Sequence, residues 1–210
     1  MKASEILYCR TRQEWRSWLA AHFEENGEIW FVFPTKASEE EGVSYNDAVE
    51  EALCFGWIDG QANALDERHH IRRFTPRRKG SSYSRPNVER LIWLDGQGLL
   101  HPKLRESVRE LIETPFVFPE DILDAIRADP AAWEHYLSFP EPYRRIRVAY
   151  IDAARGRGAE FDKRLQSFLR KTREGKLISG YGGIEKYYAQ PGSAAEANMS
   201  EKAGDLGDRP

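Results

Sequence analysis

The stretch SYNDAVEEALCFGWIDG at residues 44–60 predicts a helix that leads directly into a strand. Ser44 is a favoured residue at the N-cap of a helix, and Asp47 stands three positions later, at the spacing of a capping box. The apolar side of this helix recurs at intervals of three and four residues and consists of Tyr45, Ala48, Val49, Ala52 and Leu53. Gly56 ends the helix, and residues 57–59 are typical of a short strand. The stretch therefore indicates a domain that combines helices with strands.

The sequence on either side extends this unit into a front domain. Thr11 begins a helix near the N-terminus. Residues 28–33 are rich in β-branched and aromatic residues, which is typical of a strand. With the strands expected at residues 57–59 and 71–74, they predict a small antiparallel sheet packed with helices. Two further helices follow, at residues 84–94 and 102–112.

The second half of the chain is predicted to be an all-helical module. A proline-bracketed connector at residues 114–119 leads into it. Its four amphipathic helices are expected at residues 120–128, 131–137, 142–154 and 160–173. Beyond residue 188 large apolar residues nearly vanish, so burial cannot offset the entropy cost of ordering the chain. The predicted fold is α+β, and its parts are an α+β domain over residues 1–115, a helical module over 116–188 and a disordered tail over 189–210.

The composition limits the classes of function. The chain has 31 Lys and Arg against 34 Asp and Glu, a formal net charge of -3, and so lacks a global positive field that would attract nucleic acid or membrane. No apolar run approaches the roughly 20 residues of a membrane-spanning helix, and the first residues are too polar for a secretory signal. A soluble, cytoplasmic protein is expected. Cys9 and Cys54 are too few for a disulfide framework, and no metal or cofactor motif occurs.

The most unusual local composition lies at residues 68–85, which hold seven Lys and Arg and no acidic residue. Arginine suits the bidentate capture of phosphate or carboxylate, and the neighbouring serines can add donors in front of a helix N-terminus. The candidate ligand-binding residues are Arg72, Arg73, Arg77, Arg78, Lys79, Ser82, Ser84 and Arg85. The alternative is a solvated surface whose arginines pair with the abundant Glu and Asp of the chain. Single-stranded nucleic acid is a further candidate ligand, because Phe74 and Tyr83 interleave with the cations.

Two other classes of function remain open. A small-molecule enzyme would need polar side chains that converge in one pocket of the front domain. Its candidate residues are Asp59, His69, His70, Ser82 and Ser84. Cys54 is better interpreted as a packing residue than as a nucleophile, because the C-terminal end of a helix and apolar neighbours raise a thiol pKa. A scaffold for protein partners would show an exposed apolar patch at residues 116–118.

Two motifs, EALCFGWIDG at residues 51–60 and RFTPRRKGSSYSRPN at 73–87, resemble the YdeI/OmdA-like family of bacteriocin-protection or OmpD-associated proteins. The resemblance continues in the second half as far as GYGGIE at residues 180–185. The chain departs from the family pattern at Glu160 and Phe161, where the family usually has Thr-Arg. The resemblance implies a soluble bacterial protein linked to envelope stress or to tolerance of antimicrobial peptides, with an outer-membrane porin as a partner. It supplies no catalytic residues.

These observations favour a binding protein over an enzyme. We expect its cationic surface to hold an anionic small molecule or an acidic protein partner, such as a porin, without a metal or other cofactor. The alternative remains a small-molecule enzyme with an Asp/His/Ser pocket on the front domain.

Overall fold

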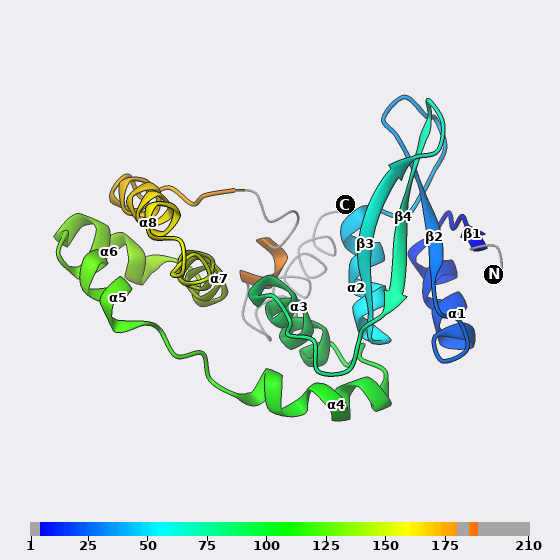
Figure 1. Ribbon diagram of the computed structural model, residues 1–210, viewed down its shortest axis with the longest axis horizontal. Coiled ribbons are helices and arrows are strands. Elements are labelled where there is room, and N and C mark those ends of the chain that lie inside the picture. The colour runs from blue at the N-terminus through cyan, green and yellow to red at the C-terminus, as the bar shows by residue number, and fades with distance from the viewer. Residues whose placement is uncertain (1–4, 180–184, 189–210) are drawn as a thin grey trace, which may run out of the picture. The chain divides into compact units, whose positions relative to one another are not determined.

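The computed structural model describes residues 5–179 and 185–188 (Figure 1). The chain forms two compact units. Unit 1 comprises Met1–Tyr83 and Gly98–Ile112, and unit 2 comprises Ser84–Gln97 and Glu113–Pro210. Unit 1 contains a sheet and helices, whereas the described residues of unit 2 are helical, so the predicted α+β class is confirmed. The tail expected at residues 189–210 lies outside the described residues.

Unit 1 is built on a four-stranded mixed sheet (Figure 1). Its strands are β1 (Glu5–Leu7), β2 (Ile29–Pro34), β3 (Trp57–Ala64) and β4 (His69–Pro76), in the spatial order β1-β2-β4-β3. β4 pairs antiparallel with both neighbours, whereas β1 pairs parallel with β2 and makes the sheet mixed rather than purely antiparallel. A strand as short as β1 carries too little periodicity to be recognised in the sequence.

The helices of unit 1 are α1 (Arg12–His22), α2 (Tyr45–Cys54) and α4 (Pro102–Glu113). The first two begin at the predicted caps. The Thr11 hydroxyl accepts a hydrogen bond from the Glu14 amide at 3.2 Å. The Ser44 hydroxyl accepts one from the Asp47 amide at 3.1 Å. Each cap satisfies a backbone donor that the first helical turn would otherwise leave without a partner.

The core of unit 1 lies between the sheet and the first two helices. The Trp15 side chain on α1 is fully buried, and its ring lies 4.8 Å from the Phe31 ring and 5.6 Å from the Phe74 ring. The Trp15 indole N–H also donates to the Ala48 carbonyl of α2 at 3.0 Å. α1 and α2 lie beside each other behind the sheet in Figure 1. We call this side the helix-covered face, and alternate strand residues point to the opposite face.

Unit 2 contains α3 (Arg85–Gly96), α5 (Glu120–Arg127), α6 (Pro130–Ser138), α7 (Glu141–Asp152), α8 (Gly158–Arg173) and the 3-10 helix η1 (Glu185–Tyr188). The four helices predicted for the second half are present, with ends within two residues of those expected. Their core includes Ile122, Ile126, Tyr136, Tyr143, Ile151 and Phe168. α3 belongs to this unit, although the sequence alone assigns it to the front domain, because its contacts are with α7.

Candidate functional site

Successive side chains of β4 point to opposite faces of the sheet, so Arg72 and Arg73 lie in different environments. Arg72 lies on the helix-covered face, where its guanidinium bonds the Asp59 carboxylate at 2.7 Å. The same guanidinium lies 4.5 Å from the centroid of the Tyr45 ring, and the Tyr45 hydroxyl donates to Asp59 at 2.8 Å. The charge of Arg72 is therefore compensated within the fold.

Arg73 points to the opposite face of the sheet and lines an open pocket of about 460 Å³. A guanidinium nitrogen of Arg73 lies 3.7 Å from a Glu28 carboxylate oxygen, and the two side chains are 42% and 38% exposed. An ion pair this long and this exposed contributes little stability. The pocket is lined by Gly27, Glu28, Ile58, Arg73, Thr75, Pro76, Arg77, Arg78 and Ser81.

The loop at residues 77–83 brings two more arginines to this pocket. The Arg77 guanidinium donates to the Ser82 carbonyl at 2.8 Å and lies 3.8 Å from the centroid of the Tyr83 ring. Arg78 also lines the pocket, and its side chain is exposed. Within the described part of the chain, neither Arg77 nor Arg78 forms an ion pair with a carboxylate. Their charges are thus available to a ligand.

The other predicted residues lie outside the pocket. Arg85 belongs to unit 2, where it pairs with the buried Glu89 and lies 4.9 Å from the centroid of the Phe116 ring. Ser84 is the N-cap residue of α3, also in unit 2, without a side-chain cap bond. Lys79 and Ser82 are exposed in the loop that follows β4 but do not line the pocket. The structure therefore brings together Arg73, Arg77 and Arg78, adds Ser81, and leaves out Arg72, Lys79, Ser82, Ser84 and Arg85.

The polar groups of the enzyme hypothesis do not meet in one place. Asp59 stands opposite Phe74 in the register of the sheet. His70 lies four residues from Phe74 on β4, a separation of roughly 13 Å along an extended strand. His69 bonds the Asp66 carboxylate at 2.9 Å, and this bond raises the pKa of His69. Asp59 bonds Arg72, His69 bonds Asp66, and His70 stacks on the Phe33 ring, so these groups have separate partners.

Cys54 has no exposed surface. Burial, with the nearby Glu51 charge, raises the pKa of the Cys54 thiol to about 12, so the group is protonated at neutral pH. These properties fit a packing residue. Among the described residues, no group of three or more His, Cys, Asp or Glu side chains could hold a metal ion.

The connector at residues 116–118 does not present a contiguous apolar patch. Phe116 and Phe118 pack against the core of unit 2, with ring centroids 4.8 Å apart. Val117, between them, is 84% exposed. One exposed side chain is ordinary on a protein surface. Nor does any described helix combine the length and the apolar composition that crossing a bilayer requires.

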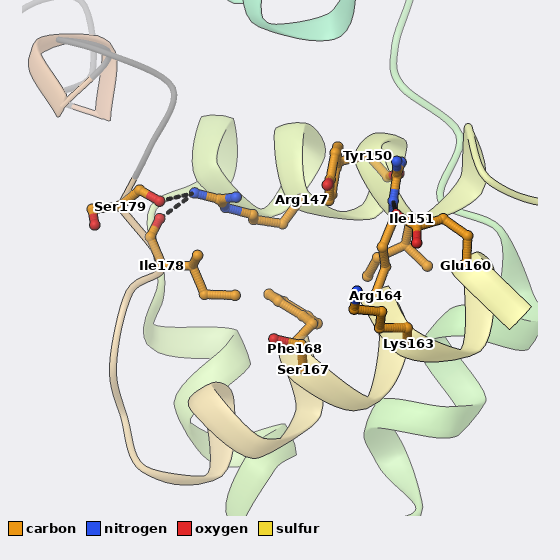
Figure 2. Close-up of a pocket in the computed structure, with 10 residues that line it drawn as sticks. All are labelled: Arg147, Tyr150, Ile151, Glu160, Lys163, Arg164, Ser167, Phe168, Ile178 and Ser179. Carbon is orange, nitrogen blue, oxygen red and sulfur yellow. Dashed lines mark hydrogen bonds and ion pairs between the residues drawn. The ribbon is translucent and has the colours of Figure 1, made fainter.

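A second pocket, of about 540 Å³, lies within unit 2 along α7 and α8 (Figure 2). Its lining includes three cationic side chains and one carboxylate. The residues are Arg147, Tyr150, Ile151, Glu160, Lys163, Arg164, Ser167, Phe168, Ile178 and Ser179. The sequence does not single out this pocket, because three separate segments form it through tertiary packing. The one local signal is the pair of cations at residues 163 and 164, which follows Glu160.

Comparison with family models assigns the two halves of the chain separately. Residues 7–107 match a domain of unknown function, DUF8412. Residues 115–175 match OmdA, the family described as bacteriocin-protection, YdeI or OmpD-associated. Residues 115–175 are therefore similar to the OmdA family, and we call this stretch the OmdA domain.

This match confirms the resemblance to the OmdA family over residues 115–175. The motifs at residues 51–60 and 73–87 lie in the other matched stretch, whose description gives no function. Most of the lining of the unit 2 pocket, from Arg147 to Phe168, lies in the OmdA domain. No curated protein and no solved structure matches the chain.

Proposed function

We propose that this protein is a binding protein of the bacteriocin-protection type that holds an anionic ligand between Arg73, Arg77 and Arg78. We call this site the arginine pocket. The observation that carries the proposal is that Arg77 and Arg78 reach the pocket without a carboxylate partner among the described residues. The bacteriocin-protection part is supported by the OmdA domain.

The chemistry of the arginine pocket favours a phosphate or carboxylate group. Guanidinium groups bind such groups through two parallel hydrogen bonds. The Tyr83 ring and the Ser82 carbonyl hold Arg77 in place, so little side-chain entropy is lost when an anion binds. The long Arg73–Glu28 pair costs little to exchange for a ligand. Ser81 also lines the pocket, and its hydroxyl accepts from Arg77 at 3.2 Å and donates to the Arg78 carbonyl at 2.8 Å.

The contacts of Tyr83 favour a small anion over single-stranded nucleic acid. Base stacking requires an aromatic face that is open to the base. Arg77 already covers a face of the Tyr83 ring, 3.8 Å from its centroid. An acidic segment of a protein partner, such as the OmpD that the family description names, would compete with the small anion for the same arginines.

The test is the binding of inorganic pyrophosphate, measured by isothermal titration calorimetry at low and at physiological salt. Arg78→Gln removes an exposed side chain that has no ion pair in the described structure, so the fold is retained. We expect the affinity for pyrophosphate to fall about tenfold, close to the ~1.5 kcal/mol of a hydrogen bond to a charged group. The affinity of the unchanged protein should also fall as salt rises.

The matched control is Arg68→Gln, which removes the same charge from an exposed position just before β4, at the end of that strand away from the pocket. Its affinity for pyrophosphate should stay within roughly twofold of the unchanged protein. Equal weakening by Arg68→Gln and Arg78→Gln would mean that only net charge matters. That result, or no binding by the unchanged protein, would exclude the arginine pocket as the binding site.

A further inference from the structure

The pocket of unit 2 has the composition of a second, independent binding site (Figure 2). We propose that it binds a small molecule that carries one carboxylate group on an apolar body. Its volume of about 540 Å³ falls within the range of small-molecule sites. This site shares no residue with the arginine pocket, so each can be tested without the other.

The floor of the pocket is apolar and rigid. Ile151 of α7 and Phe168 of α8 are each 1% exposed and belong to the core of unit 2. The Phe168 ring is fixed by the Tyr136 ring, 6.3 Å away between centroids. Figure 2 shows the Ile178 side chain directed toward Phe168 across this floor. Such a surface accepts the apolar body of a ligand, because burying it removes apolar area from water.

Arg147 fixes one wall of the pocket. This side chain is 6% exposed and donates to the carbonyls of Ile178 and, at 3.4 Å, Ser179 (Figure 2). These carbonyls lie in the segment that follows α8, and the bonds hold this segment to α7. The buried guanidinium also adds positive potential at the edge of the apolar floor.

Arg164 is held in place at the end of the pocket that faces Arg147. Its guanidinium donates to the Glu160 carboxylate at 2.8 Å and to the Tyr150 carbonyl at 2.7 Å. The same group lies 3.8 Å from the centroid of the Tyr150 ring. The one carboxylate of the lining is therefore hydrogen-bonded to Arg164.

Lys163 supplies the charge that a ligand can use. It lies on α8 and is exposed, and although the Glu160 charge acts on it, it makes no ion pair within 4.0 Å with a described residue. Ser167 follows four residues later, so its hydroxyl lies on the same side of the helix. One ammonium and one hydroxyl match the single charge and the two oxygens of a carboxylate. A doubly charged phosphate would need a second cation that is not already bonded to carbonyl groups or to Glu160.

The experiment compares 3-phenylpropionate with its neutral amide, 3-phenylpropanamide, and with propionate, which lacks the apolar ring. Binding to the full chain is followed by the shifts of backbone amide signals in two-dimensional NMR spectra. We expect 3-phenylpropionate to bind saturably and to shift signals of α7 and α8, whereas the amide and propionate bind at least about tenfold more weakly. Inorganic pyrophosphate should not displace 3-phenylpropionate.

Lys163→Gln is expected to weaken 3-phenylpropionate about tenfold, and Ser167→Leu, which places an apolar side chain in the pocket, should abolish binding. Lys171→Gln is the matched control, because Lys171 lies on α8 outside the lining and its ammonium is 3.8 Å from Glu174. Equal binding of acid and amide, or equal effects of Lys163→Gln and Lys171→Gln, would overturn the proposal. Absence of binding by 3-phenylpropionate, hexanoate and indole-3-acetate alike would also overturn it.

Discussion

Arg72 and Arg73 carry the same side chain but have different electrostatic environments, because neighbouring strand residues point to opposite faces of a sheet. Arg72 bonds Asp59 at 2.7 Å on the helix-covered face. Arg73 lies 3.7 Å from Glu28 on the other face. Before it could bind an anion, Arg72 would have to break a close, partly buried pair, and this would leave Asp59 uncompensated. A shift of one position along β4 thus determines that Arg73, and not Arg72, can bind an anion in the pocket.

The two buried thiols, Cys9 and Cys54, allow a prediction about their reactivity. Burial raises the pKa of Cys54 to about 12 and that of Cys9 to about 11, so both are protonated at pH 8 as well as enclosed. Since the thiolate is the reactive form, iodoacetamide at pH 8 should alkylate neither thiol in the folded protein and both after unfolding in urea. Peptide mass spectrometry would locate the label. Rapid alkylation of Cys54 in the folded protein would contradict its interpretation as a packing residue.

At the scale of elements, the sequence predicts those whose signals are local. The caps at Thr11 and Ser44 are read directly from side-chain chemistry and spacing. The second half of β3, residues 60–64, has low strand propensity, and the sequence predicts a strand only over residues 57–59. It becomes a strand because it pairs with β4, a contact that no local pattern records.

The two candidate sites also differ in how far local sequence signals predict them. The basic run from Arg72 to Arg85 is visible as composition, but strand alternation and the start of α3 distribute its members over different environments. The unit 2 pocket has no comparable signature, since it depends on how α7, α8 and residues 178–179 pack. The sequence therefore indicates which charged and polar side chains are present, and tertiary contacts determine which of them lie together in a pocket.

The attachment of α3 to α7 gives a prediction for these two elements. Glu89 of α3 is 1% exposed and bonds both Arg85 and, through two bonds of 2.7 Å each, Arg145 of α7. Glu89→Gln would leave the largely buried Arg85 without its carboxylate and Arg145 with only the exposed Glu141, so we expect the free energy of unfolding to fall by about 3 kcal/mol. Urea denaturation followed by circular dichroism measures this change.

Glu141→Gln is the control for this substitution. Glu141 bonds the same Arg145 at 2.6 Å, but its side chain is 55% exposed. Exposed ion pairs contribute little, so the free energy of unfolding should change by less than about 1 kcal/mol. Similar effects of Glu89→Gln and Glu141→Gln would show that burial of the α3–α7 contact is not what gives it strength.

For the whole molecule, ion pairs on unit 2 should make stability depend on pH. Hydrogen bonds from Arg155, Arg164 and Lys176 lower the pKa values of Asp121, Glu160 and Glu174. A carboxyl group whose pKa is lower in the folded than in the unfolded state stabilises the fold above its unfolded pKa. That contribution is lost as the pH falls through the folded pKa. We therefore expect the melting temperature to fall more steeply between about pH 5 and 3 than between pH 7 and 5.

Arg155→Gln removes the cation that Asp121 shares with Asp152, which Arg155 also bonds at 2.8 Å. Arg155 bonds Asp121 at 2.8 Å and also lies 5.1 Å from the centroid of the Phe161 ring. If its effect is electrostatic, the variant should melt below the unchanged protein at pH 7, and the difference should shrink as the pH falls through the lowered folded pKa of Asp121. Arg68→Gln should show no such dependence on pH. A difference that stays constant even below the pH at which the carboxyl groups are protonated would instead assign the effect to packing on Phe161.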